Sequence, residues 1–183
     1  INNGVLQQYD APLTVYAKPN NLFAADFVGN PSINFVEAKG AQSADGSVEL
    51  AVLDGIKARF TPTEKIDLAK WFAQRDQRRE EKLANQKAAA SKKGYVEKGN
   101  KDEVFRYHIA KVEDQDDAMV EEPVLTNEDL VLGIRPELLQ IDPNGALEGE
   151  IYGAMPTGME STIKIRVGNY LLTGVVFGNT LFK

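Results

Sequence analysis

The stretch from Gly94 to Lys101 is the part of the sequence that most resembles a phosphate-binding loop. Gly94 and Gly99 have the required spacing, and in such a loop backbone N–H groups surround the phosphate while a lysine neutralises its charge. Asn100 stands at the position of that lysine. The stretch also follows a predicted helix and precedes a predicted strand, which is the reverse of the order that directs N–H groups at a phosphate. We therefore interpret it as a linker.

Other residues that could do chemistry are sparse. Asp114, Asp116 and Asp117 suggest a calcium loop, but the glycine and the terminal glutamate at the required offsets are missing. The chain has no cysteine and one histidine, His108, so it has neither the thiolates nor the paired histidines of a typical zinc site. No serine lies in a nucleophile elbow. The sequence predicts no catalytic residue, no metal site and no cofactor of the chain's own.

The charge balance bears on the partners. The chain of 183 residues has 21 Lys and Arg against 27 Asp and Glu, a net charge of −6. Proteins that bind nucleic acid usually carry a concentrated basic face. No apolar run reaches the roughly 18–20 residues of a membrane span, and no secretory signal opens the chain. We therefore expect a cytoplasmic protein that does not bind nucleic acid.

Two short helices are expected before the first strand. Pro12 suits the first turn of one helix, which Pro19 ends. Asn20 or Asn21 can cap the second helix, and Gly29 can follow its end.

The rest of the chain predicts short strands interrupted by one helical arm. Strands are expected at 33–39, 48–53, 104–112, 130–134, 147–152, 161–167 and 170–177. Residues 62–90 contain no glycine and are rich in helix formers, with apolar residues on one side of the first half. Residues 113–129 carry eight acids and no bases, which is typical of a solvated connector.

Both ends of the chain suggest a fragment. Asn3-Gly4 and Gly178-Asn179 are turn signals, and each is expected to join two strands of a hairpin. Only a few residues lie outside either turn. We therefore expect that a longer protein continues beyond this chain.

Residues near the start of the chain, and two short motifs later in it, fall at spacings typical of one family. The early residues are Gly4, Gln8, Pro12, Val15, Tyr16, Pro19, Phe23, Ala25, Phe27, Gly29, Pro31, Asn34 and Phe35. The later motifs are Leu132-Gly133-Ile134-Arg135-Pro136-Glu137 and Gly158-Met159-Glu160. Together they resemble the ATP-binding subunits of sugar-uptake ABC transporters of the maltose-importer type. The early residues resemble the region after the nucleotide-binding domain, and the two motifs resemble parts of the C-terminal regulatory domain, called TOBE.

The resemblance implies a fold and a domain organisation. The fold would be mainly β (α+β), an OB-like TOBE barrel or sandwich with two short N-terminal helices and an inserted helical arm. Residues 1–36 would be the tail of the nucleotide-binding domain with connector helices, and 37–60 the first part of the regulatory β-domain. Residues 61–103, which have no counterpart in the family pattern, would be the inserted arm and linker. Residues 104–183 would complete the β-domain.

The resemblance also implies a function. The chain would be a regulatory and dimerisation region, not an enzyme, while ATP and magnesium would bind the missing nucleotide-binding domain. Its partners would be a second copy, the permease subunits and a regulatory protein, and it would lie on the inner face of the cell membrane. The interface residues would be Arg135, Pro136, Glu137, Gly158 and Glu160.

Two other functions remain open at this level. The turn around Gly158, with Ser161 and Thr162 nearby, could bind an oxyanion or a sugar, as some related barrels do. An OB-like barrel could also stack single-stranded nucleic acid on Tyr107, Tyr152 or Tyr170. The acidic balance disfavours both an anionic ligand and a nucleic acid.

Overall fold

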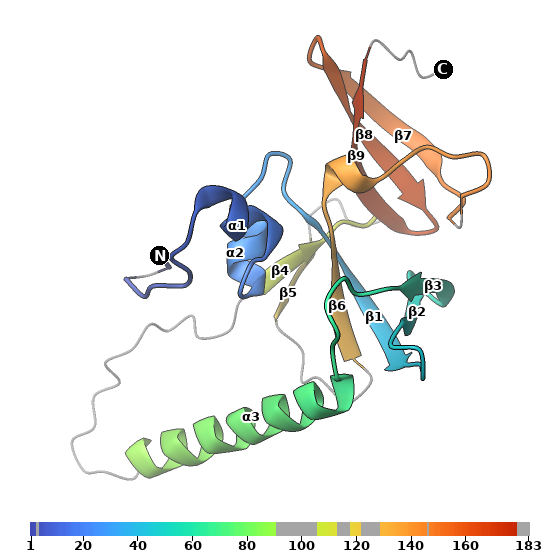
Figure 1. Cartoon of the computed structure of the whole chain (residues 1–183). Helices are drawn as coiled ribbons and strands as arrows, with labels where there is room; N and C mark the ends of the chain where they lie inside the picture. The colour runs from blue at the N-terminus through green and yellow to red at the C-terminus, as the bar shows by residue number, and fades with distance from the viewer. Residues whose placement is uncertain (3, 91–105, 113–117, 122–128, 146, 179–183) are drawn as a thin grey trace.

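The structure is a computed structural model that describes residues 1–2, 4–90, 106–112, 118–121, 129–145 and 147–178 (Figure 1). Three helices, one 3₁₀ helix and nine strands lie in these ranges. In chain order they are α1 (Pro12–Ala17), α2 (Leu22–Phe27), β1 (Asn34–Gln42), β2 (Val48–Val52), β3 (Ile56–Phe60), α3 (Leu68–Ala90), β4 (Arg106–Ile109), β5 (Ala118–Glu121), β6 (Asp129–Ile134), η1 (Pro136–Leu138), β7 (Glu150–Pro156), β8 (Glu160–Val167) and β9 (Tyr170–Phe177).

The two N-terminal helices begin where the sequence predicts. Pro12 is the first residue of α1, where its missing N–H costs nothing. Asn21 caps α2, and its side chain accepts a hydrogen bond of 2.8 Å from the N–H of Ala24. Both helices are only six residues long, so their position depends on contacts with the rest of the chain.

The first sheet is antiparallel and has the strand order β3-β2-β1-β6. β1 lies inside this sheet, because Asn34 pairs with Ile134 of β6 and Gln42 with Val48 of β2. β1 is also buried on both faces, since Phe35 and Val36 point to opposite sides and are each at most 5% exposed. It is the central strand of the molecule.

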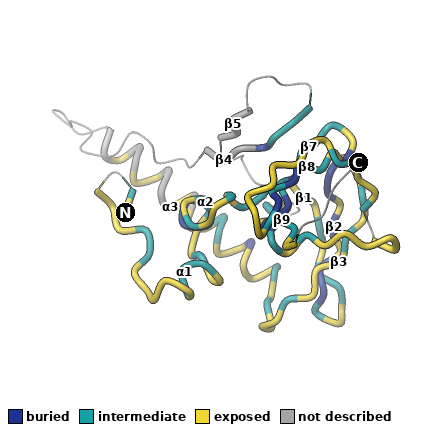
Figure 2. Tube along the Cα trace, turned by 90° about the horizontal axis from the view of Figure 1, so that it is seen from above, coloured by how far each residue is buried: buried dark blue, intermediate teal, exposed yellow. Residues whose placement is uncertain are grey.

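A three-stranded antiparallel sheet, β7-β8-β9, packs against the first sheet. The main core contains Val36 and Leu50 from the first sheet together with Val167 and Leu172 from the second. A smaller core on the other side of β1 contains Phe35, Ala25 of α2, and Tyr107 and Ile109 of β4. Buried residues accordingly concentrate where these strands meet (Figure 2).

The predicted fold class is confirmed. The described part is mostly β, with two short N-terminal helices and a helical arm, and its antiparallel sheets form an open sandwich instead of a closed barrel. The predicted alternation in β8 is also observed, since Ile163 and Val167 are buried and Arg166 is exposed.

Three elements differ from the prediction. β5 lies inside the acidic stretch 113–129, which was predicted to be a connector throughout, because four of its residues pair with β4. β3 was not predicted, although it pairs with β2 along five residues. The arm helix begins at Leu68 instead of residue 62, after Asp67 accepts a hydrogen bond of 3.0 Å from the N–H of Lys70.

Helix α3 extends away from the sheets (Figure 1). Its start is fixed by Gln42 of β1, whose side chain accepts from the N–H of Leu68 at 3.0 Å and donates to the carbonyl of Ile66 at 2.8 Å. Phe72 is buried at this end. In the described residues no helix is both long enough and apolar enough to cross a bilayer.

Candidate functional site: the Arg135 junction and the adjacent cleft

The Arg135 side chain is buried at the junction between the two N-terminal helices and the β-sandwich. Strand β6 ends at Ile134, and Arg135 keeps an extended backbone because Pro136 follows it. The 3₁₀ helix η1 then turns the chain toward the second sheet. Only 7% of Arg135 is exposed, so its charge must be satisfied within the protein.

The guanidinium group donates to three backbone carbonyls at the C-terminal ends of α1 and α2. Nη2 donates to the Tyr16 carbonyl at 2.9 Å, and Nη1 donates to the carbonyls of Ala25, at 3.0 Å, and Val28. Helix ends leave their last carbonyls without partners inside the helix, and they carry partial negative charge. One planar cation therefore satisfies both helix ends and holds them on the sandwich.

Tyr16 completes this junction. Its ring centroid lies 4.1 Å from the Arg135 guanidinium carbon, which is a cation–π contact, and its hydroxyl donates to Glu137 Oε1. The hydrogen bond to Glu137 raises the pKa of Tyr16, and burial adds to this shift, while the nearby Arg135 opposes it. Glu137 and Arg135 therefore hold Tyr16 from two sides.

Gly29 leaves room for this arrangement. Its φ of +128° lies in a region that side chains rarely adopt, and a Cβ built on it would lie 3.1 Å from Arg135 Nη1. The family pattern in the sequence includes this glycine as a helix end. The structure adds that its missing side chain makes space for the guanidinium group.

The predicted site residues fall in two places. Arg135, Pro136 and Glu137 form one cluster at the junction, with Pro136 fully buried. Gly158 lies in the turn between β7 and β8 with a φ of +103°, and Glu160 is the first residue of β8, where its carbonyl accepts from the N–H of Thr157 at 2.8 Å.

Asn34 is a structural link that the sequence reasoning did not single out as a site. Its side chain donates to the carbonyls of Ile134, at 3.1 Å, and Thr173, at 2.8 Å, and accepts from the N–H of Thr173 at 2.7 Å. It thus joins β6 of the first sheet to β9 of the second. Its position within the family pattern was the only signal in the sequence.

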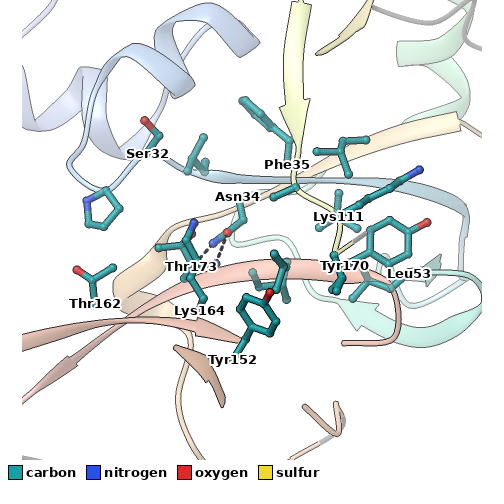
Figure 3. A pocket seen from close by; sticks show the side chains of 18 of the residues that line it. Ser32, Asn34, Phe35, Leu53, Lys111, Tyr152, Thr162, Lys164, Tyr170 and Thr173 are labelled. Carbon is teal, nitrogen blue, oxygen red and sulfur yellow. Dashed lines mark hydrogen bonds between the residues drawn. The ribbon is translucent and has the colours of Figure 1, made fainter. Parts of the chain in front are cut away.

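A cleft of about 830 Å³ lies between β1 and the second sheet (Figure 3). Two lysines line it: Lys164, whose ammonium donates to the Thr173 hydroxyl at 2.8 Å, and Lys111, which lies 5.9 Å from the ring centroid of Tyr170. Tyr152 and Thr162 add an aromatic ring and a hydroxyl group to its lining. This combination of cations, hydroxyls and aromatic rings suits a small anionic or polyhydroxylated molecule.

Other candidate sites find no support or lie outside the described residues. Among the residues that the structure describes, no group of three His, Asp or Glu side chains could hold a metal ion. The stretch from Gly94 to Lys101 and the cluster of Asp114, Asp116 and Asp117 lie outside the described residues. His108 occupies strand β4, as predicted.

The chain is similar over short stretches to ATP-binding proteins of bacterial and archaeal import systems. It is 41% identical over 56 residues to the osmoprotective compounds uptake ATP-binding protein of Synechocystis sp., covering 31% of this chain and 15% of the relative. It is 41% identical over 61 residues to the diacetylchitobiose uptake system ATP-binding protein of Streptomyces coelicolor, covering 32% and 16%. It is 53% identical over 38 residues to the trehalose/maltose import ATP-binding protein of Thermococcus litoralis, covering 21% and 10%. The chain matches no family model.

These relatives define a general kind of protein. They are ATP-binding subunits of ABC transporters, sugar importers among them, and the matched stretches span between 10% and 19% of their lengths. A spermidine/putrescine import protein is also among them, at 37% identity over 70 residues. The similarity therefore indicates the kind of subunit without selecting one transported compound.

Proposed function

We propose that this chain is the regulatory and dimerisation region of the ATP-binding subunit of an ABC importer for carbohydrates. The similarity to ATP-binding subunits of sugar importers supports the general kind. The observation that carries the proposal is the Arg135 junction, because it fixes two short helices to the β-sandwich through a buried cation. Such a joint can transmit position and force.

In this function the chain links catalysis to regulation. ATP and magnesium belong to the nucleotide-binding domain of the full protein, and the chain has no cofactor of its own. The helices α1 and α2 connect that domain to the sandwich, and the Arg135 junction makes this connection rigid. The sandwich joins two subunits, so the nucleotide-binding domains open and close without separating.

The partners and the location follow from the same proposal. The partners are a second copy of the subunit, the permease subunits, which the full protein contacts, and a regulatory protein that binds the sandwich. The subunit lies in the cytoplasm on the inner face of the membrane. Glu137, Gly158 and Glu160 are proposed to contribute to its contacts, and the buried Arg135 and Pro136 to hold that surface in place.

Analytical ultracentrifugation of this chain, from micromolar to millimolar concentration, tests the proposal. We expect a reversible monomer–dimer equilibrium. A strict monomer over the whole range would contradict it. In the full-length protein, Arg135→Ala is expected to weaken the response of ATP hydrolysis to the permease while nucleotide binding stays unchanged, because the substitution loosens the link but leaves the nucleotide site intact.

A second candidate function is the sensing of a small oxyanion or sugar. The observation that favours it is the cleft in Figure 3, in which Lys111 and Lys164 lie within a chain that is otherwise acidic. Thermal unfolding in the presence of molybdate, sulfate or a panel of sugars tests it. We expect one class to raise the midpoint in the parent chain but not in Lys164→Met. No stabilisation by any of them would exclude this function.

A further inference from the structure

Charge is distributed unevenly between the arm and the rest of the chain. Helix α3 contains six Lys and Arg against three acids, a net charge of +3, whereas the remaining residues together carry −9. Opposite charges on two parts of one chain can attract within a molecule or between two copies. The position of the charges decides between these possibilities.

The basic residues of α3 gather on one side of the helix, together with a tryptophan. Trp71, Arg75 and Arg78 follow each other at intervals of four and three residues, so they share a face. Glu80 falls on the opposite side by the same spacing, whereas Asp76 pairs with Arg75. We call Trp71, Arg75 and Arg78 the basic stripe.

The basic stripe is exposed at Trp71 and Arg78, whereas the Arg75 side chain is only 16% exposed and forms an ion pair with Asp76 at 2.8 Å. Trp71 is 49% exposed, and the Arg75 guanidinium carbon lies 5.7 Å from the Trp71 ring centroid and 4.9 Å from that of Phe72. Arg78 is exposed. An aromatic ring with arginines around it is the composition enriched at protein–protein contacts.

The helix presents this surface at a distance from the sandwich. Gln42 and the buried Phe72 fix its first turn, and its 23 residues then extend about 34 Å at 1.5 Å per residue. Figure 1 shows α3 at the opposite end of the molecule from the sheet β7-β8-β9. The stripe therefore cannot reach that sheet in its own copy.

A complementary surface lies beside β7. The 28 residues from 136 to 163 contain five acids and no Lys or Arg. Asp142, Glu148 and Glu150 are exposed in the loop that leads into β7 and at its first residue. Ile141 and Tyr152, on the same stretch, are 62% and 59% exposed. This acidic loop, residues 139–150, combines negative charge with apolar area, as the basic stripe combines positive charge with Trp71.

We propose that the basic stripe of α3 packs against the acidic loop of a second copy of this chain. The proposal rests on the dimerisation given under Proposed function and names the contact. A two-fold axis makes the contact occur twice, since each copy supplies one arm and one loop. Charge attraction then selects the partner and its orientation, while Trp71 and the apolar loop residues exclude water.

Charge reversal on each side of the contact tests this proposal. In Arg78→Glu the dimer dissociation constant is expected to rise at least about tenfold, which corresponds to about 1.4 kcal/mol. The matched control is Lys70→Glu, which changes the charge of the same helix equally but at a position outside the stripe. This control is expected to dimerise like the parent chain. Circular dichroism checks that all variants keep their helix content.

A mixing experiment identifies the acidic loop as the other side. Asp142→Lys/Glu148→Lys is expected to weaken its own dimer, and mixing it with Arg78→Glu should restore a heterodimer. In that mixture both contacts again join opposite charges. The chain has no cysteine, so one cysteine introduced into each variant can be labelled with a dye. Energy transfer between the two dyes then measures heterodimer formation.

The outcomes separate this inference from the proposed function. If the parent chain dimerises and the stripe variant dimerises equally well, the arm contact is wrong and the dimerisation stands. Failure of the mixed variants to form a heterodimer would likewise overturn the contact. A chain that stays monomeric at every concentration would contradict both the arm contact and the proposed dimerisation.

Discussion

Replacing Arg135 is the sharpest test of the junction between the N-terminal helices and the sandwich. Arg135→Ala removes a buried cation and leaves the carbonyls of Tyr16, Ala25 and Val28 without this donor. Hydrogen bonds to a charged group contribute about 1.5–3 kcal/mol each, and a cation–π contact adds about 0.5–2 kcal/mol. The sum of these contributions is an upper limit on the loss, because water reaches part of the opened site and bonds to the freed carbonyls. We expect a loss of about 3–5 kcal/mol in the free energy of unfolding, the range for breaking a buried polar network.

Urea denaturation, followed by circular dichroism and tryptophan fluorescence, measures this loss. Arg135→Lys keeps the charge but not the planar group that contacts two helices and stacks on Tyr16, so about half of the loss is expected. Hydrogen exchange should show earlier opening of α1 and α2 than of the strands. Arg59→Ala is the control, because Arg59 forms exposed ion pairs with Asp45 and Glu49, which contribute at most about 1 kcal/mol. A loss below about 1 kcal/mol for Arg135→Ala would refute the reasoning.

Three further predictions concern Tyr16 and Gly29 at the junction and Gln42 at the start of α3. Tyr16→Phe should cost about 1 kcal/mol. Glu137 and burial raise the pKa of Tyr16 above 10.0, so the stability that the Tyr16 hydroxyl contributes is complete below pH 10 and is lost as the pH rises through the pKa of the folded state. The loss of stability at alkaline pH should therefore be smaller in Tyr16→Phe than in the parent chain. Urea titrations between neutral and alkaline pH measure this difference. Gly29→Ala should lower the free energy of unfolding by about 1–3 kcal/mol, and by more than Gly46→Ala does. Both glycines have positive φ, but only Gly29 faces the guanidinium group. Thermal unfolding of the two variants compares these costs. Gln42→Ala should release the first turn of α3 at a cost of about 1–2 kcal/mol, and unchanged hydrogen exchange in that turn would contradict it.

Local signals allowed the helix boundaries to be predicted. Pro12 and Asn21 act within one turn of their own helices, so sequence alone places both starts. The turn at Asp142–Gly145 is also local, because the N–H of Gly145 bonds to the carbonyl of Asp142 at 3.0 Å.

Two strands that form by pairing with the preceding strand escaped prediction. Acidic residues disfavour a strand locally, yet β5 forms because it pairs with β4, and tertiary pairing overrides the local preference. β3 likewise needs β2 beside it.

The sequence predicted which residues belong to the site but not the contacts that they make. The resemblance in the sequence singled out Arg135, but as an interface residue. Its acceptors lie 107 to 119 residues earlier in the chain, at the ends of two helices. No local pattern carries that information, because it arises only when β6 pairs with β1.

The pairing of β1 with β6 has a consequence for synthesis on the ribosome. β1 ends at Gln42, whereas its second neighbour is complete only at Ile134, about 90 residues later. At a translation rate of about 5–20 residues per second, one edge of β1 stays open for roughly 5–20 seconds. During this interval the nascent chain exposes an unpaired strand edge bordered by Phe35 and Val36, which is a typical binding site for a chaperone.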